Sequence, residues 1–315
     1  MDDDVLVAAV ARRHFVEEVS KSQIADEMGV SRFKVARLLD QARRDGVVTI
    51  EVRTPTHVDL PLSERVARLF SLRQVVAVRP ADPGPAGLRR ALGAACGSLL
   101  AHRLTEDDVL GVSWGRTLQA LADESPALPP ADVVQLVGSI PGVDLDVGPL
   151  ELVRRLGHRT GGRVHPLHVP AVLPEPGLAA ALRATDPVRA TLAAHERLTH
   201  AVVGVGAWAP TGSSLRPLLP PDVVRACEEA GAVAETCSTV LDAEGQVVAG
   251  SLVPDHCVAV TTDRLRAVRD VVAVAAGAEK VEAVRAVVRA GLVHHLVTDV
   301  PTARALLAGV EGPEG

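Results

Sequence analysis

Hydrophobic positions in residues 1–54 recur at the spacing of a helix. The first set falls at i, i+3, i+4 and i+8, on one helical face: Val7, Val10, Ala11 and Phe15. A capping box at 20–23 (SKSQ) starts a second helix, which Gly29 ends because glycine adopts the left-handed conformation freely. Ser31 caps a third helix. The pattern predicts an all-α unit followed by a short strand at 47–52.

From about residue 72 the pattern changes, because short β-branched runs alternate with amphipathic helices. This alternation is typical of a parallel sheet with helices on its faces. The predicted strands are 75–78, 109–112, 133–137, 164–168, 201–205, 258–260, 271–275 and 294–297. The predicted helices are 62–70, 87–103, 150–160, 187–198, 221–230, 280–290 and 302–308. The sequence therefore predicts an α/β protein: an all-α domain at 1–54, a linker at 55–61 and a larger Rossmann-like domain at 62–315.

Charge and composition narrow the function. The 315-residue chain has a net charge of −6, which argues against a protein that coats nucleic acid without sequence preference. Residues 31–44 nevertheless hold five basic side chains and one acidic side chain, a local charge of +4. With three Phe, two Trp and no Tyr, stacking platforms for single-stranded bases are excluded. The acidic start (MDDD) and the shortness of the apolar runs predict a cytoplasmic protein with no membrane contact.

The second and third predicted helices have the spacing of a helix-turn-helix, whose second helix enters the major groove of double-stranded DNA. The residues expected near base edges are Ser31, Arg32, Phe33, Lys34 and Arg37, with Arg32 and Lys34 reading guanine. Phosphate contacts are assigned to Ser20, Lys21, Ser22 and Arg37. Phe33 has two open roles, contact with a thymine methyl group or packing against the preceding turn. An amphipathic helix pair with a solvated basic face is the alternative for the whole segment.

The stretch 31–39 (SRFKVARLL), with 42–43 (AR) and 46–48 (GVV), resembles the helix-turn-helix of SorC-type sugar-binding transcriptional regulators, often called SorC/DeoR-like. The resemblance extends to Leu307 and so covers almost the whole chain. It departs at Lys21, where the family usually has glutamine, and at His14-Phe15, where it has an aromatic pair. It also departs at His256, where the family often has an arginine that is a candidate partner of an anionic ligand.

The strand-to-helix turn at 108–119 (DVLGVSWGRTLQ) carries the chemistry of the larger domain. A helix N-terminus presents unpaired N–H groups and a partial positive charge, which suits an anion. Gly111 and Gly115 let a ligand approach the backbone, while Ser113 and Thr117 supply hydroxyl groups. Arg116 adds a planar cation suited to phosphate. A tight turn with an exposed arginine is the alternative.

Residues 111–118 resemble the phosphate loop of SorC-type effector domains, whose fold is similar to that of sugar-phosphate isomerases and CoA transferases. Matches continue at 204–206 (GVG), 231–235 (GAVAE), 242–245 (DAEG), 275–280 (AAGAEK) and 296–299 (LVTD). The resemblance implies an effector site built from Gly111, Ser113, Trp114, Gly115, Arg116, Thr117, Gly204, Gly206, Glu235 and Lys280. Arg116 and Lys280 are the expected phosphate or hydroxyl partners, and Glu235 accepts hydrogen bonds from sugar hydroxyls. A surface ion pair with Glu279 or Glu282 is the alternative for Lys280.

Other patterns predict no cofactor and no metal. Residues 204–209 match G-x-G-x-x-A, but Pro210 and Gly212 follow before any helical pattern and no acid ends a next strand about 20 residues later, so NAD is not expected. The histidine pairs 165/168 and 294/295 lack a carboxylate at ligand spacing. The four cysteines lack zinc spacing and are expected to be buried free thiols.

These features predict a DNA-binding transcriptional regulator, not an enzyme, whose operator binding is controlled by a sugar or sugar phosphate. A single helix-turn-helix buries little DNA, so a homodimer or homotetramer on a palindromic operator is expected. The rival class is a sugar-phosphate isomerase-like enzyme with an accessory helical domain, using Glu235 or Asp299 as acid or base. A second rival is a DNA-binding scaffold without a ligand. The sign of regulation stays open.

Overall fold

The computed structural model describes residues 3–49, 57–140, 148–248 and 252–308. The chain divides into two compact units, Met1–Thr54 and Pro55–Gly315. Each unit has its own hydrophobic core, so each is stabilised by its own packing. Within the described residues no helix is long and apolar enough to cross a membrane.

The first unit consists of helices α1 (Asp3–Phe15), α2 (Lys21–Met28) and α3 (Arg32–Arg44). The predicted caps are confirmed: the Ser20 hydroxyl accepts the Gln23 N–H, the Ser31 hydroxyl accepts the Lys34 N–H, and Gly29 has a φ of 65°. Fully buried side chains from all three helices form the core, among them Val10, Ile24 and Val35.

The predicted strand at 47–52 is wrong at its described positions, because Val47 and Val48 form a bend after α3. The Val48 N–H donates to the Ala42 carbonyl over 3.0 Å, which ties the bend to the end of the helix. The remaining predicted strand positions, 50–52, and the linker positions 55–56 lie outside the described residues. The next helix, α4, spans Leu60–Leu69 and so begins within the predicted linker, where the Asp59 side chain caps it.

Seven strands of the described residues form one sheet in the order β1-β10-β9-β5-β2-β3-β4, and every pair in it is parallel. The strands are β1 (Gln74–Val78), β2 (Val109–Val112), β3 (Asp132–Gln135), β4 (Val164–His165), β5 (His200–Gly204), β9 (Asp270–Val274) and β10 (His295–Asp299). The predicted strand at 164–168 stops at His165 because Pro166 has no N–H to donate to a ladder.

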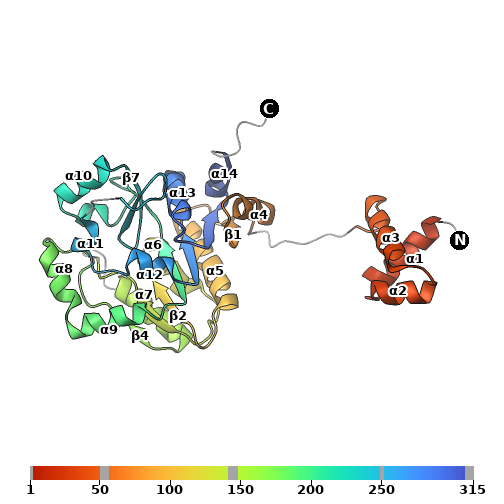
Figure 1. The fold of residues 1–315 in the computed structure, drawn as a ribbon, viewed down its shortest axis with the longest axis horizontal. Coiled ribbons are helices and arrows are strands. Elements are labelled where there is room, and N and C mark those ends of the chain that lie inside the picture. Colours follow the sequence, from red (N-terminus) through yellow and green to blue (C-terminus); the bar gives the residue numbers. More distant parts are fainter. Residues whose placement is uncertain (1–2, 50–56, 141–147, 249–251, 309–315) are drawn as a thin grey trace. The chain divides into compact units, whose positions relative to one another are not determined.

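Helices cover both faces of this sheet (Figure 1). One face is packed by α5 (Pro85–Arg103), α6 (Arg116–Glu124) and α7 (Pro149–Thr160). The other is packed by α4, α9 (Asp186–His195), α12 (Thr262–Arg266), α13 (Val281–Arg289) and α14 (Val300–Ala308). The architecture confirms the predicted α/β fold with an all-α unit at its N-terminus.

A smaller antiparallel sheet, none of whose strands is among the predicted strands, stands beside the large one: β6 (Gly206–Ala207), β7 (Ala232–Thr236) and β8 (Thr239–Asp242). The resemblance implies only a turn and a D-x-x-G hairpin at 231–245. Its core includes Trp208 and residues of α10 (Pro221–Glu229) and α11 (Val253–His256). The remaining helices are α8 (Pro176–Arg183) and the 3-10 turns η2 (Arg216–Leu218) and η3 (Ala278–Lys280).

The predicted strand at 258–260 is wrong. This segment makes isolated bridges from Cys257 to Val172 and from Ala259 to Val137. Its backbone bonds alternate between these two neighbours, since the Val258 N–H donates to Ala171 and the Val260 N–H donates to Leu136. Neither side therefore acquires the continuous ladder of a strand.

Candidate functional site

The start of α3 is an exposed basic surface. Ser31, Arg32, Phe33, Lys34 and Arg37 are all exposed, while Val35, Leu38 and Leu39 on the same helix are buried. The segregation follows the helical repeat, so one face of α3 packs on the core and the other is free to contact DNA. On α2, Lys21 is half-buried, and Ser20 before it and Ser22 are exposed.

Phe33 resolves one of the open roles. Its side chain is 84% exposed, so packing against the preceding turn is wrong. Because this ring is exposed at the start of a basic helix, it can contact a ligand without giving up packing contacts with the rest of the fold. His14 and Phe15 pack edge to face, and Arg43 lies 5.2 Å from the Phe15 ring centroid. The departure at His14-Phe15 is thus accommodated by packing between α1 and α3.

In the second unit, the order of the strands in the sheet creates a crevice. Strands β3 and β4 follow β2 toward one edge of the sheet, whereas β5, β9 and β10 lead from β2 toward the other. The order therefore reverses between β2 and β5, and in open parallel sheets ligands bind outside the carboxyl ends at such a switch point. A cavity of about 700 Å³ lies here, lined by the segments that follow β2, β3, β5 and β9.

The structure brings nine of the ten predicted effector residues to this cavity: Ser113, Trp114, Gly115, Arg116, Thr117, Gly204, Gly206, Glu235 and Lys280. The two loops at the switch point are bonded together, because the Gly204 N–H donates to the Ser113 hydroxyl over 3.1 Å. The Thr236 hydroxyl donates to the Gly204 carbonyl over 2.9 Å. Ser113 and Gly204 thus hold each other in place rather than standing free.

Glu235 is the buried carboxylate of the cavity, with 8% of its surface exposed. The Ser213 hydroxyl donates to its Oε1 over 3.2 Å, and Ser213 itself accepts the N–H groups of Leu215 and Arg216. Burial raises the pKa of the Glu235 carboxyl to about 7, against the opposing effects of the Ser213 bond and the Lys280 charge. Near neutral pH this group can therefore donate or accept a hydrogen bond.

Lys280 ends η3 and is half-buried beside the cavity. Burial lowers the pKa of its ammonium group, and the carboxylates of Glu279 and Glu235 oppose that change. Glu282 pairs with Arg285 instead, so the surface pair between Lys280 and Glu282 is wrong. Arg116 begins α6, is exposed, and has no carboxylate partner among the described residues.

Gly111 is the predicted site residue that the structure places elsewhere. It is buried within β2, and a Cβ there would lie 2.6 Å from Leu136 Cδ2 and 2.8 Å from Leu198 Cδ2. Its missing side chain therefore makes room for the packed side chains of Leu136 and Leu198, not for the approach of a ligand.

Two further positions are also structural. His256 is 4% exposed and its Nδ1 lies 2.8 Å from the Leu173 carbonyl oxygen, away from the cavity lining. The departure from arginine at this position therefore removes no side chain from the cavity. Asp299 accepts the Thr302 N–H at the start of α14 and does not line the cavity, which leaves the enzyme alternative without its second acid.

The sequence missed several lining residues. Arg89 reaches the cavity from α5, Ser213 from the loop after β6, and Cys237 with Ser238 from the turn between β7 and β8. Cys237 and Ser238 have φ values of 47° and 66°, as the two-residue turn of a tight hairpin requires. A loop rich in serine and glycine at 211–214 is the signal that indicates Ser213, whereas Arg89 is placed by tertiary packing alone.

Among the described residues no group of His, Cys, Asp and Glu is arranged to hold a metal ion. All four cysteines are buried free thiols, as predicted. The paired histidines have other partners: His165 lies 3.4 Å from Asp132, and His295 lies 2.9 Å from Asp270.

Known proteins resemble the chain over nearly its whole length. Residues 55–308 match the family model described as "Putative sugar-binding domain". The chain is 29% identical to the "Uncharacterized transcriptional regulator YjhU" of Escherichia coli K12, over 98% of this chain and 95% of that protein. It is 28% identical to the erythritol catabolism regulatory protein EryD of Brucella abortus, over 98% of each chain. The full-length sorbitol operon regulator SorC of Klebsiella pneumoniae has the same fold, with a TM-score of 0.74 at 22% identity over 98% of this chain and 100% of that one.

A helix-turn-helix unit joined to a doubly wound ligand-binding domain defines a transcriptional regulator that responds to a small molecule. The chain belongs to the sugar-binding family of SorC-type transcriptional regulators, as the sequence predicts. The relatives named above are regulators, so the enzyme alternative gains no support from them.

Proposed function

We propose that residues 1–54 bind operator DNA through α3 and that residues 62–315 bind a sugar or sugar phosphate at the switch-point cavity. In this proposal Arg32 and Lys34 read base edges, Phe33 contacts a thymine methyl group, and phosphates are bound by Ser20, Lys21, Ser22 and Arg37. The hydroxyl of Ser31 stays engaged as the cap of α3.

One observation carries the effector half of the proposal: nine residues that the sequence singles out line one cavity at the switch point. Its volume of about 700 Å³ lies within the range of small-molecule sites, roughly 300–1,000 Å³. Arg89, Arg116 and Lys280 supply cations for a phosphate or for hydroxyl oxygens. Glu235 and Ser213 supply the polar pair that orients sugar hydroxyls.

The DNA half rests on the exposed basic face of α3. Because one recognition helix covers a single half-site, we propose a homodimer or homotetramer on a palindromic operator. The protein then acts in the cytoplasm, where the operator is. The effector favours one arrangement of the oligomer and the operator favours the same or another, so each ligand changes the affinity of the other by the same factor.

The test separates the two ligands. Fluorescence anisotropy with the DNA upstream of the gene measures operator binding, and a thermal-shift panel of free and phosphorylated pentoses and hexoses measures effector binding. A ligand at 100 times its dissociation constant should raise the free energy of unfolding by about 2.7 kcal/mol.

A double variant, Arg32→Ala with Lys34→Ala, should lose operator binding and keep the ligand shift. Turnover of a sugar phosphate without operator binding would instead establish the enzyme alternative, and a panel without any shift would favour the ligand-free scaffold.

A further inference from the structure

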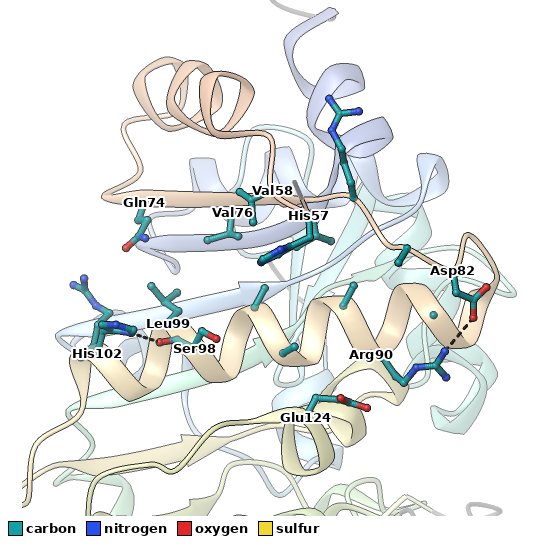
Figure 2. A pocket seen from close by; sticks show the side chains of 18 residues that line it. His57, Val58, Gln74, Val76, Asp82, Arg90, Ser98, Leu99, His102 and Glu124 are labelled. Carbon is teal, nitrogen blue, oxygen red and sulfur yellow. Dashed lines mark hydrogen bonds and ion pairs between the residues drawn. The ribbon is translucent and has the colours of Figure 1, made fainter. Parts of the chain in front are cut away.

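Two hollows of the larger unit differ in how their acidic side chains are paired. One hollow lies between β1 and α5, has a volume of about 790 Å³ and is lined by none of the predicted effector residues (Figure 2). There the Asp82 carboxylate accepts a hydrogen bond from Arg90 over 3.0 Å (Figure 2). In the switch-point cavity, by contrast, the buried Glu235 forms no ion pair with any described residue. Its carboxyl group is therefore available to a ligand.

The hydrogen bonds of Ser213 fix where a proton on Glu235 must lie. A serine hydroxyl has one hydrogen to donate and two lone pairs with which to accept. Ser213 Oγ accepts the N–H groups of Leu215 and Arg216, over 3.1 and 3.0 Å. Its own hydrogen therefore goes to Glu235 Oε1, 3.2 Å away. Because Oε1 is thus an acceptor, the hydrogen of a neutral carboxyl group belongs on Oε2.

The two oxygens of Glu235 also differ in their surroundings. The Gly206 backbone packs against Oε1, since a Cβ on that glycine would lie 2.4 Å from it. No described residue makes a hydrogen bond to Oε2, although the side chain lines the cavity. A ligand in the cavity would therefore bond to Glu235 at Oε2, the oxygen that carries the hydrogen.

The surroundings favour the neutral carboxyl group over the carboxylate. A buried carboxylate without a paired cation is costly, whereas a neutral carboxyl group needs only hydrogen-bond partners. Glu235 is near the Cys237 thiol of the hairpin turn, the Cys257 thiol that follows α11, and the Lys280 ammonium group of η3. Burial raises the pKa of Cys237 to about 12 and that of Cys257 to about 11, so both thiols are uncharged.

Lys280 is the charge that acts on Glu235, because the charged groups of the helices packed against β7 are paired elsewhere or exposed. On α13, Arg285 pairs with Glu282, and Arg289 donates to the Ala243 carbonyl. On α10, Glu228 pairs with Arg216, and the remaining charged groups are exposed: Asp222, Arg225 and Glu229. Burial raises the pKa of Glu235 to about 7 against the opposing effects of Ser213 and Lys280, so both of its forms are populated near neutral pH.

We infer that Glu235 binds the effector as a neutral carboxylic acid, donating a hydrogen bond from Oε2 to an effector oxygen, so that effector binding takes up a proton above neutral pH. The inference rests on the proposed function, because it concerns the same cavity. It assigns an acceptor to the effector at this point, such as a carbonyl, ring or hydroxyl oxygen. A rise in pH then weakens effector binding, and operator binding responds to pH as well as to the sugar.

Isothermal titration of the full-length protein at pH 6 and pH 8 tests the proton. The probes are those free and phosphorylated pentoses and hexoses of the panel that give a thermal shift. Because the neutral form of Glu235 decreases to about a tenth of the protein at pH 8, wild-type affinity should be about tenfold lower there than at pH 6. Glu106→Gln, at an exposed position, should keep this wild-type dependence.

Two variants of Glu235 separate the hydrogen from the side chain. Glu235→Gln carries an amide that donates at either pH, so its affinity should be the same at pH 6 and pH 8. Glu235→Ala should bind roughly five- to tenfold more weakly than Glu235→Gln at pH 6, because it lacks the donor. Equal affinity of these two variants at pH 6 overturns the inference. A pH dependence that persists in Glu235→Gln belongs to Lys280 or to the probe and also overturns it.

The proton itself can be counted. Titration in two buffers with different ionisation enthalpies gives the number of protons taken up on binding. At pH 8 the wild type should take up close to one proton more than Glu235→Gln, and at pH 6 close to none. Equal uptake by the two proteins at pH 8 contradicts the inference.

Ser213→Ala tests the geometry at Oε1. The bond from Ser213 stabilises the ionised carboxylate, so its loss should move the midpoint of the pH dependence to higher pH. A midpoint that stays or moves to lower pH overturns the assignment of the hydrogen to Oε2. Absence of binding by every probe contradicts the proposed function, whereas binding with an affinity independent of pH contradicts this inference alone.

Discussion

Gly206 and Glu235 are paired across β6 and β7, and the glycine makes room for the carboxylate. A Cβ on Gly206 would lie 2.4 Å from Glu235 Oε1, closer than any packed contact allows. The second glycine of G-V-G at 204–206, a sequence that resembles a nucleotide-binding pattern, is therefore explained by the position of an acidic side chain in the switch-point cavity.

Gly206→Ala should weaken effector binding more than it weakens the fold. The added methyl group displaces the Glu235 carboxylate, which is the free end of a side chain and can move, so the backbone need not shift. We expect a tenfold loss of ligand affinity, about 1.4 kcal/mol, with a small change in the melting temperature. Gly177→Ala is the control, since a Cβ there meets nothing within 4 Å. Equal ligand affinity for both variants would contradict a binding role of Glu235.

Glu235 should also make stability depend on pH. Its pKa in the folded state is about 7 because of burial, above the ordinary value of 4.5, so its neutral form is favoured by the fold. The resulting stability is fully present below about pH 4.5 and is lost as the pH rises through about 7. Compared with Glu235→Gln, the wild type should lose up to about 3 kcal/mol over this interval.

Chemical unfolding of both proteins from pH 4 to pH 8 measures this difference. Glu106→Gln, at an exposed position, is the matched control. Parallel pH profiles for the wild type and Glu235→Gln would show that the carboxylate is not held neutral by the fold.

Phe33→Ala should separate DNA binding from folding. Because the ring is 84% exposed, its removal should change the free energy of unfolding by less than about 0.5 kcal/mol. Loss of an apolar contact with a thymine methyl should cost about 1 kcal/mol of operator binding. Val35→Ala, at a fully buried position two residues on, should instead destabilise the unit by about 2 kcal/mol. A fall in stability for Phe33→Ala like that of Val35→Ala would mean that the ring packs on the fold.

Gly111 and Gly115 are close in the sequence, and the same substitution to alanine should affect the protein differently at the two positions. Gly111→Ala should destabilise the protein by about 1–3 kcal/mol, because its Cβ meets Leu136 and Leu198 inside the core. Gly115→Ala should leave stability unchanged, since the nearest atom to its Cβ is 3.8 Å away and its φ of 168° suits any residue. Only Gly115→Ala should weaken ligand binding, because its methyl group enters the cavity lining. Calorimetric titration with the ligand found in the panel, alongside thermal unfolding, decides between these roles.

The fold could be predicted from the sequence because its signals are local. Caps such as Ser20 and Ser31 mark helix starts by their own chemistry, and runs such as 271–275 carry enough β-branched residues to identify buried strands. The strand β6 of the small antiparallel sheet escaped prediction because it has two residues and its partner β7 lies about thirty positions away. Pairing of that kind depends on contacts that no local pattern records.

The site could be predicted in part for the same reason. Arg116 and Lys280 lie in turns that the sequence marks by glycines and helix starts, whereas Arg89 lies within α5 and reaches the cavity because α5 packs against α6. The predicted ligand-binding role of Gly111 is wrong. The sequence alone does not show whether a glycine in a strand makes room for a ligand or for packed side chains, which here are those of Leu136 and Leu198.

Arg116→Ala and Lys280→Ala should reveal whether the effector is phosphorylated. Arg116 is exposed at the start of α6 without a carboxylate partner among the described residues, so its charge is available to a ligand. A charge-assisted bond to phosphate contributes about 1.5–3 kcal/mol, so each variant should bind a sugar phosphate roughly ten to a hundred times more weakly. The unphosphorylated sugar should lose much less affinity in Arg116→Ala, because hydroxyl groups of a sugar carry no charge.

Arg189→Ala, at an exposed position of α9 paired with Asp186, controls for the loss of a surface charge. Isothermal titration of the wild type and each variant with a sugar and with its phosphate gives the affinities to compare. Equal losses for the two ligands would place the phosphate away from Arg116, and unchanged affinity in Arg116→Ala would contradict the phosphate loop itself.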